Sequence, residues 1–316
     1  MNKALRITLA LVLIALVGVL VFGLMTKGTF GFIQNEEYIL VEKTYTASEY
    51  SKFDFEVDNR SVTVLPSTTG NVELSYYDSE NDFVELLENG DTLKLINDPV
   101  WYHAIFSGIF PTEMSIYNKM TLYLPQTVDY ELDIQSTNGR VEVSECDNLL
   151  ALTLETTNGS LFVNSVSCTG LVSVETVNGG VYLDSVVFQS NVELTSSNGG
   201  IHLEDVLVSG EIVAETTNGG LEMDTIQANQ MDLTSVNGSV DGDKIVASQV
   251  KIVTTNGHID MEIDGLFADY HVQMLTGNGS YYLNGTPVTI NIYHTDQTNK
   301  LDFKTTNGSI RVSFTE

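Results

Sequence analysis

Apolar and polar residues alternate with a period of two over most of the chain after residue 45. The segment LALTLETT (150–157) precedes Asn158, and SLFVNSV (160–166) follows Gly159. Alternation of this kind is typical of strands with one buried face and one solvated face. No helical spacing is sustained after residue 26, so the pattern predicts an all-β protein.

Asn-Gly pairs punctuate the alternation at nearly constant spacing. Nine pairs succeed one another at intervals of 20, 20, 20, 20, 19, 19, 22 and 29 residues, and they begin at Asn138, Asn158, Asn178, Asn198, Asn218, Asn237, Asn256, Asn278 and Asn307. Apolar residues hold fixed places in each repeat, as Leu161, Val181 and Ile201 do three positions after the Asn. A fixed period of this length indicates a repeated structural unit of about 20 residues.

Two architectures fit the repeat. Asn-Gly between alternating strands can form type I′ turns, which would give antiparallel hairpins. It can also mark the corner of a β-solenoid, because both residues tolerate left-handed backbone. The conserved residue type in each column favours the solenoid, in which equivalent residues stack on one another. We therefore expect successive parallel coils and a ladder of corner asparagines, formed by Asn138, Asn158, Asn178, Asn198, Asn218, Asn237 and Asn256.

The sequence is less regular before the regular repeat (131–316) and near the C-terminal end of that repeat. Residues 45–130 predict irregular coils, interrupted at 98–118 by an aromatic insertion, and residues 279–306 predict a C-terminal cap. The insertion is either an end cap or a contact site for a surface protein or glycan, because aromatic side chains favour such contacts. Its candidate contact residues are Trp101, Tyr102, Phe106, Phe110 and Tyr117.

The N-terminal segment predicts attachment to a membrane. Residues 7–25 are free of charge and long enough to cross a bilayer as one helix. Lys3 and Arg6 precede this segment, so the positive-inside rule places the tail 1–6 in the cytoplasm. The linker 26–44 and all that follows would then lie outside the plasma membrane, in a single-pass topology. A cleaved signal peptide is the alternative, but the apolar run is long and no small-x-small cleavage site follows it.

Charge excludes one class of function. The chain has 14 Lys and Arg against 42 Asp and Glu, a formal net charge of −28. A nucleic-acid binder needs clustered cations to contact phosphates, so nucleic acid is excluded as a partner.

Acidic residues also form a column six positions after the corner Asn. The column contains Asp184, Glu204, Asp224, Asp243 and Glu262. Stacked carboxylates would repel one another, and weak calcium binding would relieve the repulsion. A solvated acidic face that keeps the protein soluble is the simpler interpretation. No other cofactor is expected.

Catalytic chemistry is not evident. No zinc-protease motif, nucleophile elbow, phosphate loop or dinucleotide fingerprint occurs. Cys146 and Cys168 fall in apolar columns, where they suit buried thiols; an intercoil disulfide is the alternative. We therefore predict that the protein is not an enzyme.

The chain resembles a known bacterial family. The resemblance rests on strand-rich sequence, the step Leu124-Pro125 and repeats such as QSTNGRVEV (135–143). It is similar to the "putative adhesin" β-strand-repeat proteins, a family of unknown function related to toast-rack-like envelope proteins. The resemblance implies a right-handed parallel β-helix outside a bacterial membrane, and it brings no catalytic residues.

These features together predict a membrane-anchored, extracytoplasmic β-solenoid that acts as an adhesin-like binding module or a structural module. An accessory role in cell-envelope stress sensing is the alternative that the resemblance suggests. A calcium-dependent enzyme acting on polysaccharides is a further alternative. The dispersed cations of the repeat disfavour that enzyme, because such chemistry needs catalytic groups gathered in a cleft.

Overall fold

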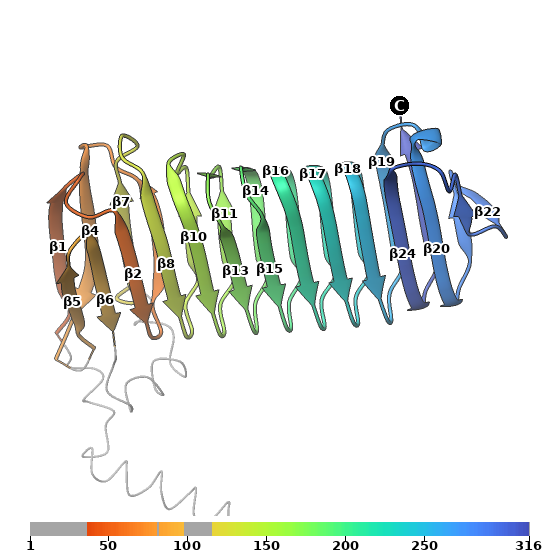
Figure 1. Cartoon of the computed structure of the whole chain (residues 1–316). Coiled ribbons are helices and arrows are strands. Elements are labelled where there is room, and N and C mark those ends of the chain that lie inside the picture. Colours follow the sequence, from red (N-terminus) through yellow and green to blue (C-terminus); the bar gives the residue numbers. More distant parts are fainter. Residues whose placement is uncertain (1–36, 81, 98–115, 316) are drawn as a thin grey trace, which may run out of the picture.

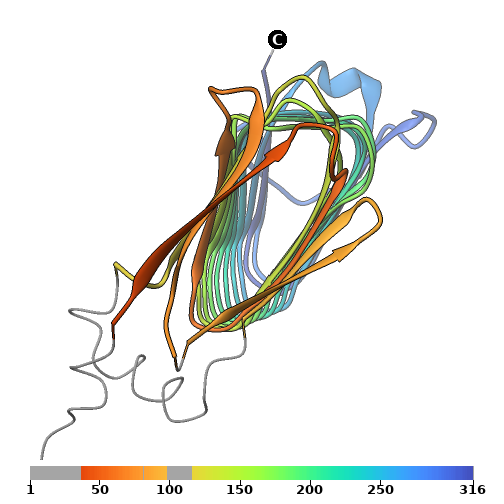
Figure 2. The ribbon, with the colours of Figure 1, turned by 90° about the vertical axis from the view of Figure 1, so that its left-hand side faces the viewer.

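The computed structural model describes residues 37–80, 82–97 and 116–315. Twenty-five strands and one short 3-10 helix, η1 (Phe267–Asp269), make up this part of the chain. The strands form flattened coils that stack along one axis, as Figure 1 shows from the side and Figure 2 from one end. Apolar side chains fill the space between the two walls of each coil and join into one continuous core.

One wall, here called the leading sheet, contains the strands that run into the Asn-Gly corner. In spatial order its strands are β5 (Val84–Asn89), β6 (Thr92–Asn97), β2 (Lys52–Val57), β8 (Tyr130–Ser136), β10 (Leu149–Thr156), β13 (Val172–Thr176), β15 (Val192–Ser196), the second halves of β16 (Ile201–Thr216), β17 (Leu221–Ser235) and β18 (Val240–Thr254), then β24 (Asn299–Asn307), β20 (Tyr270–Asn278) and β23 (Ile292–Tyr293).

The other wall, the trailing sheet, contains the strands that leave the corner in the regular coils, together with end strands that pair beside them. Its strands are β1 (Ile39–Thr46), β4 (Asn71–Asp78), β7 (Lys119–Leu124), β3 (Ser61–Pro66), β9 (Val141–Ser144), β11 (Leu161–Asn164), β14 (Val181–Phe188), the first halves of β16 to β18, β19 (Ile259–Asp264), β25 (Ile310–Thr315), β21 (Tyr281–Leu283) and β22 (Thr286–Val288). The short strand β12 (Ser167–Cys168) lies at the bend between the walls.

In the middle of the rod, each residue rests on its equivalent in the next coil. Leu154 pairs with Val174, and Val174 pairs with Leu194, in parallel register. The side-chain period of two then sends the same columns inward in every coil. Repetition of residue type in the sequence is therefore repetition of environment in the structure.

The corner requires Asn-Gly for a reason other than the predicted tolerance of left-handed backbone. Positive φ angles occur neither at the asparagines nor at the glycines of the nine repeat pairs, so the expectation of left-handed backbone there was wrong. A Cβ on Gly179 would lie 1.8 Å from the carbonyl oxygen of Gly159 in the coil before. Glycine is required because the stacked backbones approach too closely for any side chain.

Left-handed residues occur instead at the opposite bend of each coil. They fall seven positions after the corner Asn and stack on one another: Glu145, Ser165, Ser185, Asp205, Thr225 and Lys244 have φ between 51° and 60°. Because these residue types differ, the sequence shows no signature for this second bend.

The predicted purely parallel solenoid was also wrong, because the sheet is mixed. At one end of the rod β1 pairs antiparallel with β4, β4 with β7, and β5 with β6. At the other end β20 pairs antiparallel with β23, and β21 with β22. Antiparallel strands and hairpins close both ends, where a parallel coil would leave an open edge.

The last coils do not stack in chain order. Strand β24 lies between β18 and β20, and β25 lies between β19 and β21. The strands β20 and β21 therefore form the outermost coil although they come earlier in the sequence. The strands β24 and β25 follow them in the sequence and lie between that coil and the coil of β18 and β19. Both coils carry the corner sequence Asn-Gly-Ser, so either coil can stack in the same register on the coil before it.

The fold prediction also included a transmembrane helix, and the described residues contain none. In the described part of the chain, no helix has the length and apolar character needed to cross a membrane. Residues 7–25, on which that prediction rested, lie outside the described residues, as do the tail 1–6 and most of the linker.

Candidate functional site

The corner asparagines form one row of side-chain hydrogen bonds along the rod. Each amide nitrogen donates to the amide oxygen of the neighbouring Asn at 2.6–3.0 Å. The row runs in the spatial order Asn59, Asn138, Asn158, Asn178, Asn198, Asn218, Asn237, Asn256, Asn307 and Asn278. All donors point the same way, so the amide dipoles align and reinforce one another. We call this row the asparagine ladder.

A second row of hydrogen bonds lies directly inside the ladder. The Ser or Thr two positions before each corner Asn donates its hydroxyl to a backbone carbonyl of the adjacent coil, which belongs to Arg60 for Ser136 and to the corner Gly in the other coils. All of these side chains are buried except Thr276, which is half-buried. Thr176 Oγ1 reaches the Gly159 oxygen at 2.8 Å, and Ser196 Oγ reaches the Gly179 oxygen at 2.8 Å. These hydroxyls have a structural partner in every coil, so they are not free nucleophiles.

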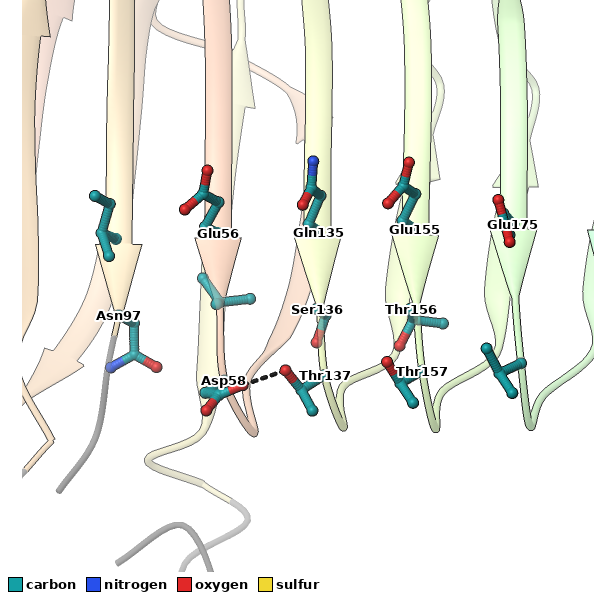
Figure 3. A pocket seen from close by; sticks show the side chains of 13 residues that line it. Glu56, Asp58, Asn97, Gln135, Ser136, Thr137, Glu155, Thr156, Thr157 and Glu175 are labelled. Atoms are coloured by element: carbon teal, nitrogen blue, oxygen red, sulfur yellow. Dashed lines mark hydrogen bonds between the residues drawn. The ribbon is translucent and has the colours of Figure 1, made fainter. Parts of the chain in front are cut away.

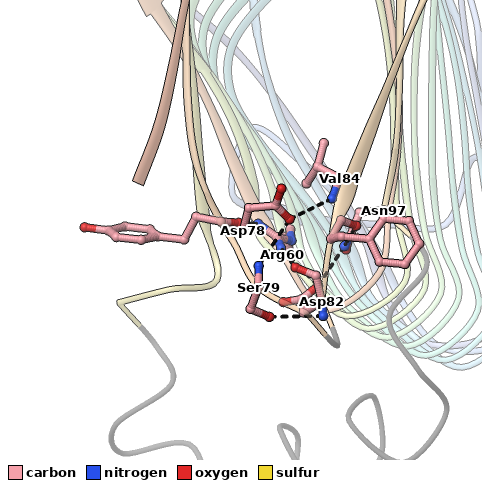
Figure 4. Close-up of polar contacts among 8 residues, drawn as sticks. Arg60, Asp78, Ser79, Asp82, Val84 and Asn97 are labelled. Atoms are coloured by element: carbon pink, nitrogen blue, oxygen red, sulfur yellow. Dashed lines mark hydrogen bonds and ion pairs between the residues drawn. The ribbon is translucent and has the colours of Figure 1, made fainter. Parts of the chain in front are cut away.

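The first coil ends the ladder in a different way. Asn59 accepts from Asn138 at 2.6 Å, but Arg60 stands where later coils have glycine. The Arg60 side chain is fully buried, 3.0 Å from Asp82 Oδ1, and donates to the Tyr77 carbonyl at 2.6 Å. Asn97 donates to the same Asp82 carboxylate at 2.7 Å (Figure 4). This buried ion pair plugs the N-terminal end of the core.

The trailing sheet carries a stack of aromatic rings on its outer surface. Phe162 and Tyr182 lie 4.6 Å apart between ring centroids and 5° from parallel, and Tyr182 and His202 lie 4.9 Å apart and 3° from parallel. The Arg140 guanidinium covers the outer face of Phe162 at 3.7 Å. At the other end His202 Nδ1 lies 2.9 Å from Glu222 Oε2.

Stacking decides what this row can bind. Ring faces are the surfaces that pack on sugars, but the neighbouring rings and Arg140 cover them here. Ring edges and the polar tips of Tyr182 and His202 are left for a ligand. The row can therefore form the wall of a groove more readily than a platform for stacking.

A groove of about 480 Å³ runs between this aromatic row and the predicted acidic column. Its acidic side is formed by Asp184, Glu204 and Asp224, which pair in register across three coils. A shallower continuation of about 370 Å³ includes Asp243 and Glu262. The structure thus places the five predicted acidic residues along one line of the trailing sheet, which we call the acidic row.

The acidic row does not gather around a point. Asp184 accepts from the hydroxyl of Ser185 at 2.7 Å, and Asp224 accepts from Thr225 at 2.8 Å. Lys244 Nζ lies 3.1 Å from Asp224 and 4.0 Å from Asp243. Within the described residues no three acidic, His or Cys side chains come together as ligands for a metal ion.

Local contacts set the protonation of these carboxyls. The hydrogen bond from Thr225, followed by that from Lys244, lowers the pKa of Asp224. In the column that continues the aromatic row beyond Glu222, burial and then the charges of Asp260 and Glu222 raise the pKa of Asp241. Repulsion is therefore relieved where a Lys or hydroxyl intervenes and persists where carboxylates stand alone.

A second groove, of about 520 Å³, follows the leading sheet beside the asparagine ladder. Glu56, Gln135, Glu155 and Glu175 line it in successive coils, and Thr137 donates to Asp58 at its edge (Figure 3). Burial, Glu175 and Asp133 raise the pKa of Glu155. This groove ends at Asn97, the last described residue before position 116.

The predicted aromatic contact residues are mostly outside the described part of the chain. Trp101, Tyr102, Phe106 and Phe110 lie outside the described residues. Tyr117 is described: its ring stacks on Tyr38 at 4.3 Å and meets Tyr77 edge-on at 5.2 Å. In this position Tyr117 packs against the N-terminal end of the rod.

The two cysteines are free thiols in the core. Both side chains are buried, and no disulfide joins them. Burial, followed by the charges of Asp147 and Glu145, raises the pKa of Cys146 to about 12, and burial also raises that of Cys168. A thiol with so high a pKa is a poor nucleophile.

Sequence reasoning missed the aromatic row, although the signal was present. Glu142, Phe162, Tyr182, His202 and Glu222 all stand four positions after a corner Asn and pair in register. Outward aromatic residues in consecutive coils are unusual beside columns of Thr, Ser and acids. That contrast could have identified the groove before its geometry was known.

The sequence of the first coils matches one protein family. The model of the Toastrack DUF4097 family matches residues 50–215, which is more than half of the chain. The chain belongs to this family. The resemblance drawn from the repeats is confirmed, and the toastrack match covers the N-terminal end as well as the first regular coils. No curated protein matches the sequence.

Solved structures of similar length superpose loosely on this toastrack protein. A protein named a putative adhesin from Bacteroides fragilis is 16% identical, with a TM-score of 0.42, and covers 87% of this chain and 97% of its own. A putative cell adhesion protein from Clostridium sporogenes is 12% identical with a TM-score of 0.32, covering 88% and 100%. A putative lipid binding protein from Parabacteroides distasonis is 12% identical with a TM-score of 0.34, covering 88% and 97%.

Proposed function

We propose that this toastrack protein is a non-enzymatic binding module and that its ligand lies in the groove of the trailing sheet. The observation that carries the proposal is the pairing of a rigid aromatic row with a row of carboxylates across several coils. Side chains that are fixed by stacking lose little entropy when a ligand binds, which favours recognition.

The groove favours an extended, cationic ligand. Its carboxylates repeat at the coil spacing of about 4.8 Å, so successive positive groups can each meet an acid. Asp184 and Glu204 line it without a Lys or Arg within ion-pair distance among the described residues. The net charge of −28 would also draw a cation toward the rod.

The arrangement around His202 supports binding over catalysis. The histidine lies against Glu222, as in a catalytic dyad, but its ring is held in the stack. Within the described part of the chain, no hydroxyl or thiol hydrogen-bonds to its other ring nitrogen. A nucleophile in reach of the base would be needed for covalent catalysis.

Titration with a lysine oligomer at low salt tests the proposal. We expect the double variant D184N/E204Q to bind about five-fold more weakly, because two exposed ion pairs are lost. The matched control is E193Q/E215Q on the leading sheet, which changes the net charge equally and should bind as the native protein does. Equal losses in both variants, or no binding at all, would overturn the groove assignment.

Two further probes define the ligand class. A glutamate oligomer of the same length should not bind, and a neutral glucose oligomer should not compete with the lysine oligomer. Displacement by the neutral oligosaccharide would show that charge is not what the groove recognises, and would favour a glycan.

We also propose that the module is attached to a membrane and faces the outside of the cell. Support comes from the sequence alone, in the charges before residue 7 and the long acidic chain that follows. Protease added to intact spheroplasts should digest residues 37–315 completely if this is correct. Digestion only after lysis would place the module inside the cell.

A further inference from the structure

Eleven Asn-Gly pairs occur in the chain, and they fall into three structural environments. Nine belong to the asparagine ladder. Asn284-Gly285 forms the turn between β21 and β22, and Asn89-Gly90 lies at the turn between β5 and β6. Asn-Gly is the sequence most open to spontaneous deamidation, because glycine has no Cβ to hinder the attack of its nitrogen on the side chain.

Deamidation has defined geometric needs. The glycine nitrogen loses its proton to solvent and attacks the Asn Cγ, forming a five-membered succinimide. The bond from Cγ to Nδ2 breaks, and ammonia leaves. Water then opens either imide carbonyl to give aspartate or isoaspartate. The side-chain amide must be free to rotate toward the following nitrogen, and that nitrogen must be unprotected.

In the ladder the side-chain amide is not free to rotate, and in some coils the glycine nitrogen is protected as well. Each interior ladder amide is held by two hydrogen bonds, as Asn198 is by Asn178 and Asn218 at 2.8 Å. In some coils the attacking nitrogen is also engaged: the Gly199 N–H donates to Ser196 Oγ at 2.9 Å. Reaction therefore requires the corner to open first.

The turn at Asn284 is partly protected in another way. Asn284 Oδ1 accepts from the Phe314 N–H at 3.0 Å, which holds the amide toward β25. Its φ of 48° and that of Gly285 at 74° give the two-residue hairpin turn that Asn-Gly favours. One hydrogen bond holds this amide, against two in the ladder.

Asn89 meets the requirements for reaction. It is exposed, and its side chain has no hydrogen bond to another described residue. It ends β5 at the edge of the leading sheet, near one end of the rod in Figure 1, and pairs with Thr92 across the turn. Gly90 lies in the turn with φ of 65°, and its N–H donates to no acceptor among the described residues.

We propose that Asn89-Gly90 is the site at which this chain is modified by spontaneous deamidation, and that the asparagine ladder protects the nine repeat pairs from the same reaction. Conversion of Asn89 to isoaspartate adds a carbon to the main chain at the strand residue that precedes the two-residue turn of Gly90 and Asp91. That insertion disturbs the register between β5 and β6, because register depends on turn length. The hairpin of β5 and β6 is then the first part of the rod to lose its native pairing as deamidation proceeds.

Peptide mapping by mass spectrometry tests the inference without any variant. The folded protein is incubated at mildly alkaline pH, beside a sample unfolded in urea. In the folded sample Asn89 should deamidate at least about ten-fold faster than any interior ladder asparagine, the factor that hydrogen bonds of this kind contribute to an opening equilibrium. In urea the eleven pairs should react at similar rates.

The variant N198A tests whether the ladder itself protects. Its loss leaves Asn178 without its donor and Asn218 without its acceptor. Deamidation should rise at these two positions and stay low at Asn138, four coils from Asn218. Unchanged rates at Asn178 and Asn218 would overturn the protective role, and an Asn89 as slow as the ladder in the folded protein would overturn the site. Neither result bears on ligand binding in the groove.

Discussion

In the regular coils every strand pairs in parallel with equivalents on both sides, whereas the outermost strands at both ends pair antiparallel. Inside the rod, each corner Asn bonds to the equivalent Asn of the next coil. The outermost coils have no equivalent coil on one side, so contacts that occur once in the structure stabilise them. Arg60 and Asp82 at one end, and the returning coil of β24 and β25 at the other, are such contacts.

The difference separates two ways of stabilising a sheet edge. In a repeat, the same corner hydrogen bond forms between every pair of neighbouring coils. An end must close the core and hide its edge once, with residues found nowhere else in the chain. Substitutions at the two places should therefore have different costs.

The largest effect is expected at the N-terminal end. D82A leaves the fully buried Arg60 guanidinium without its carboxylate, and we expect a loss of about 3–5 kcal/mol in the free energy of unfolding. Urea unfolding followed by circular dichroism measures the loss. As a control, K251A removes a surface ion pair with Asp232 and should cost less than about 1 kcal/mol. Similar costs for both variants would mean that the buried pair is not the plug of this end.

Inside the rod, the corner glycines provide the sharper test. G219A puts a Cβ 1.9 Å from the Gly199 carbonyl oxygen, and we expect a loss of about 3 kcal/mol, because neighbouring coils must move apart. The next residue is the matched control: a Cβ on Gly220 has a single neighbour, at 3.3 Å, so G220A should change stability by less than about 1 kcal/mol. Thermal unfolding of both variants would reveal the difference, and equal melting temperatures would refute close stacking at this corner.

The smallest effect concerns the carboxylates of the trailing sheet. The pKa of Asp241 is raised in the folded protein, so the folded state binds a proton more readily than the unfolded chain and is penalised once that carboxyl ionises. D241N should therefore stabilise the protein at pH 7 by about 0.5 kcal/mol, the scale of an opposed like-charge pair. The gain should vanish as the pH falls toward the ordinary pKa of Asp.

The pKa of Asp224, in the same sheet, shifts in the opposite direction from that of Asp241. Its pKa is lowered by Thr225 and Lys244, so its ionised form stabilises the folded state above its ordinary pKa. D224N should lower the melting temperature at pH 7, and that loss should disappear in acid. If both variants shift the melting temperature in the same direction at pH 7, net charge and not local contacts governs this surface.

Much of the regular region follows from local sequence. Alternation places Leu161, Val181 and Ile201 in the core, and the Asn-Gly period sets the length of each coil. The ends escaped prediction because Arg60 occupies a corner that lacks the Asn-Gly signature, and because Asn278 and Asn307 carry the same corner sequence in coils whose spatial order is reversed. The aromatic row was visible as residues in a column but not as a stack with covered faces.

The sequence by itself determined the repeat, the inward and outward columns and the family, because each depends on residue type at fixed spacing. Tertiary structure alone decided the mixed pairing at the ends, the order of the last coils and the groove. Those features depend on which strands meet across long stretches of chain, and identical corners bind one another equally well in any order. It also decided why the corner needs glycine: the reason is the distance between two coils, which no single repeat contains.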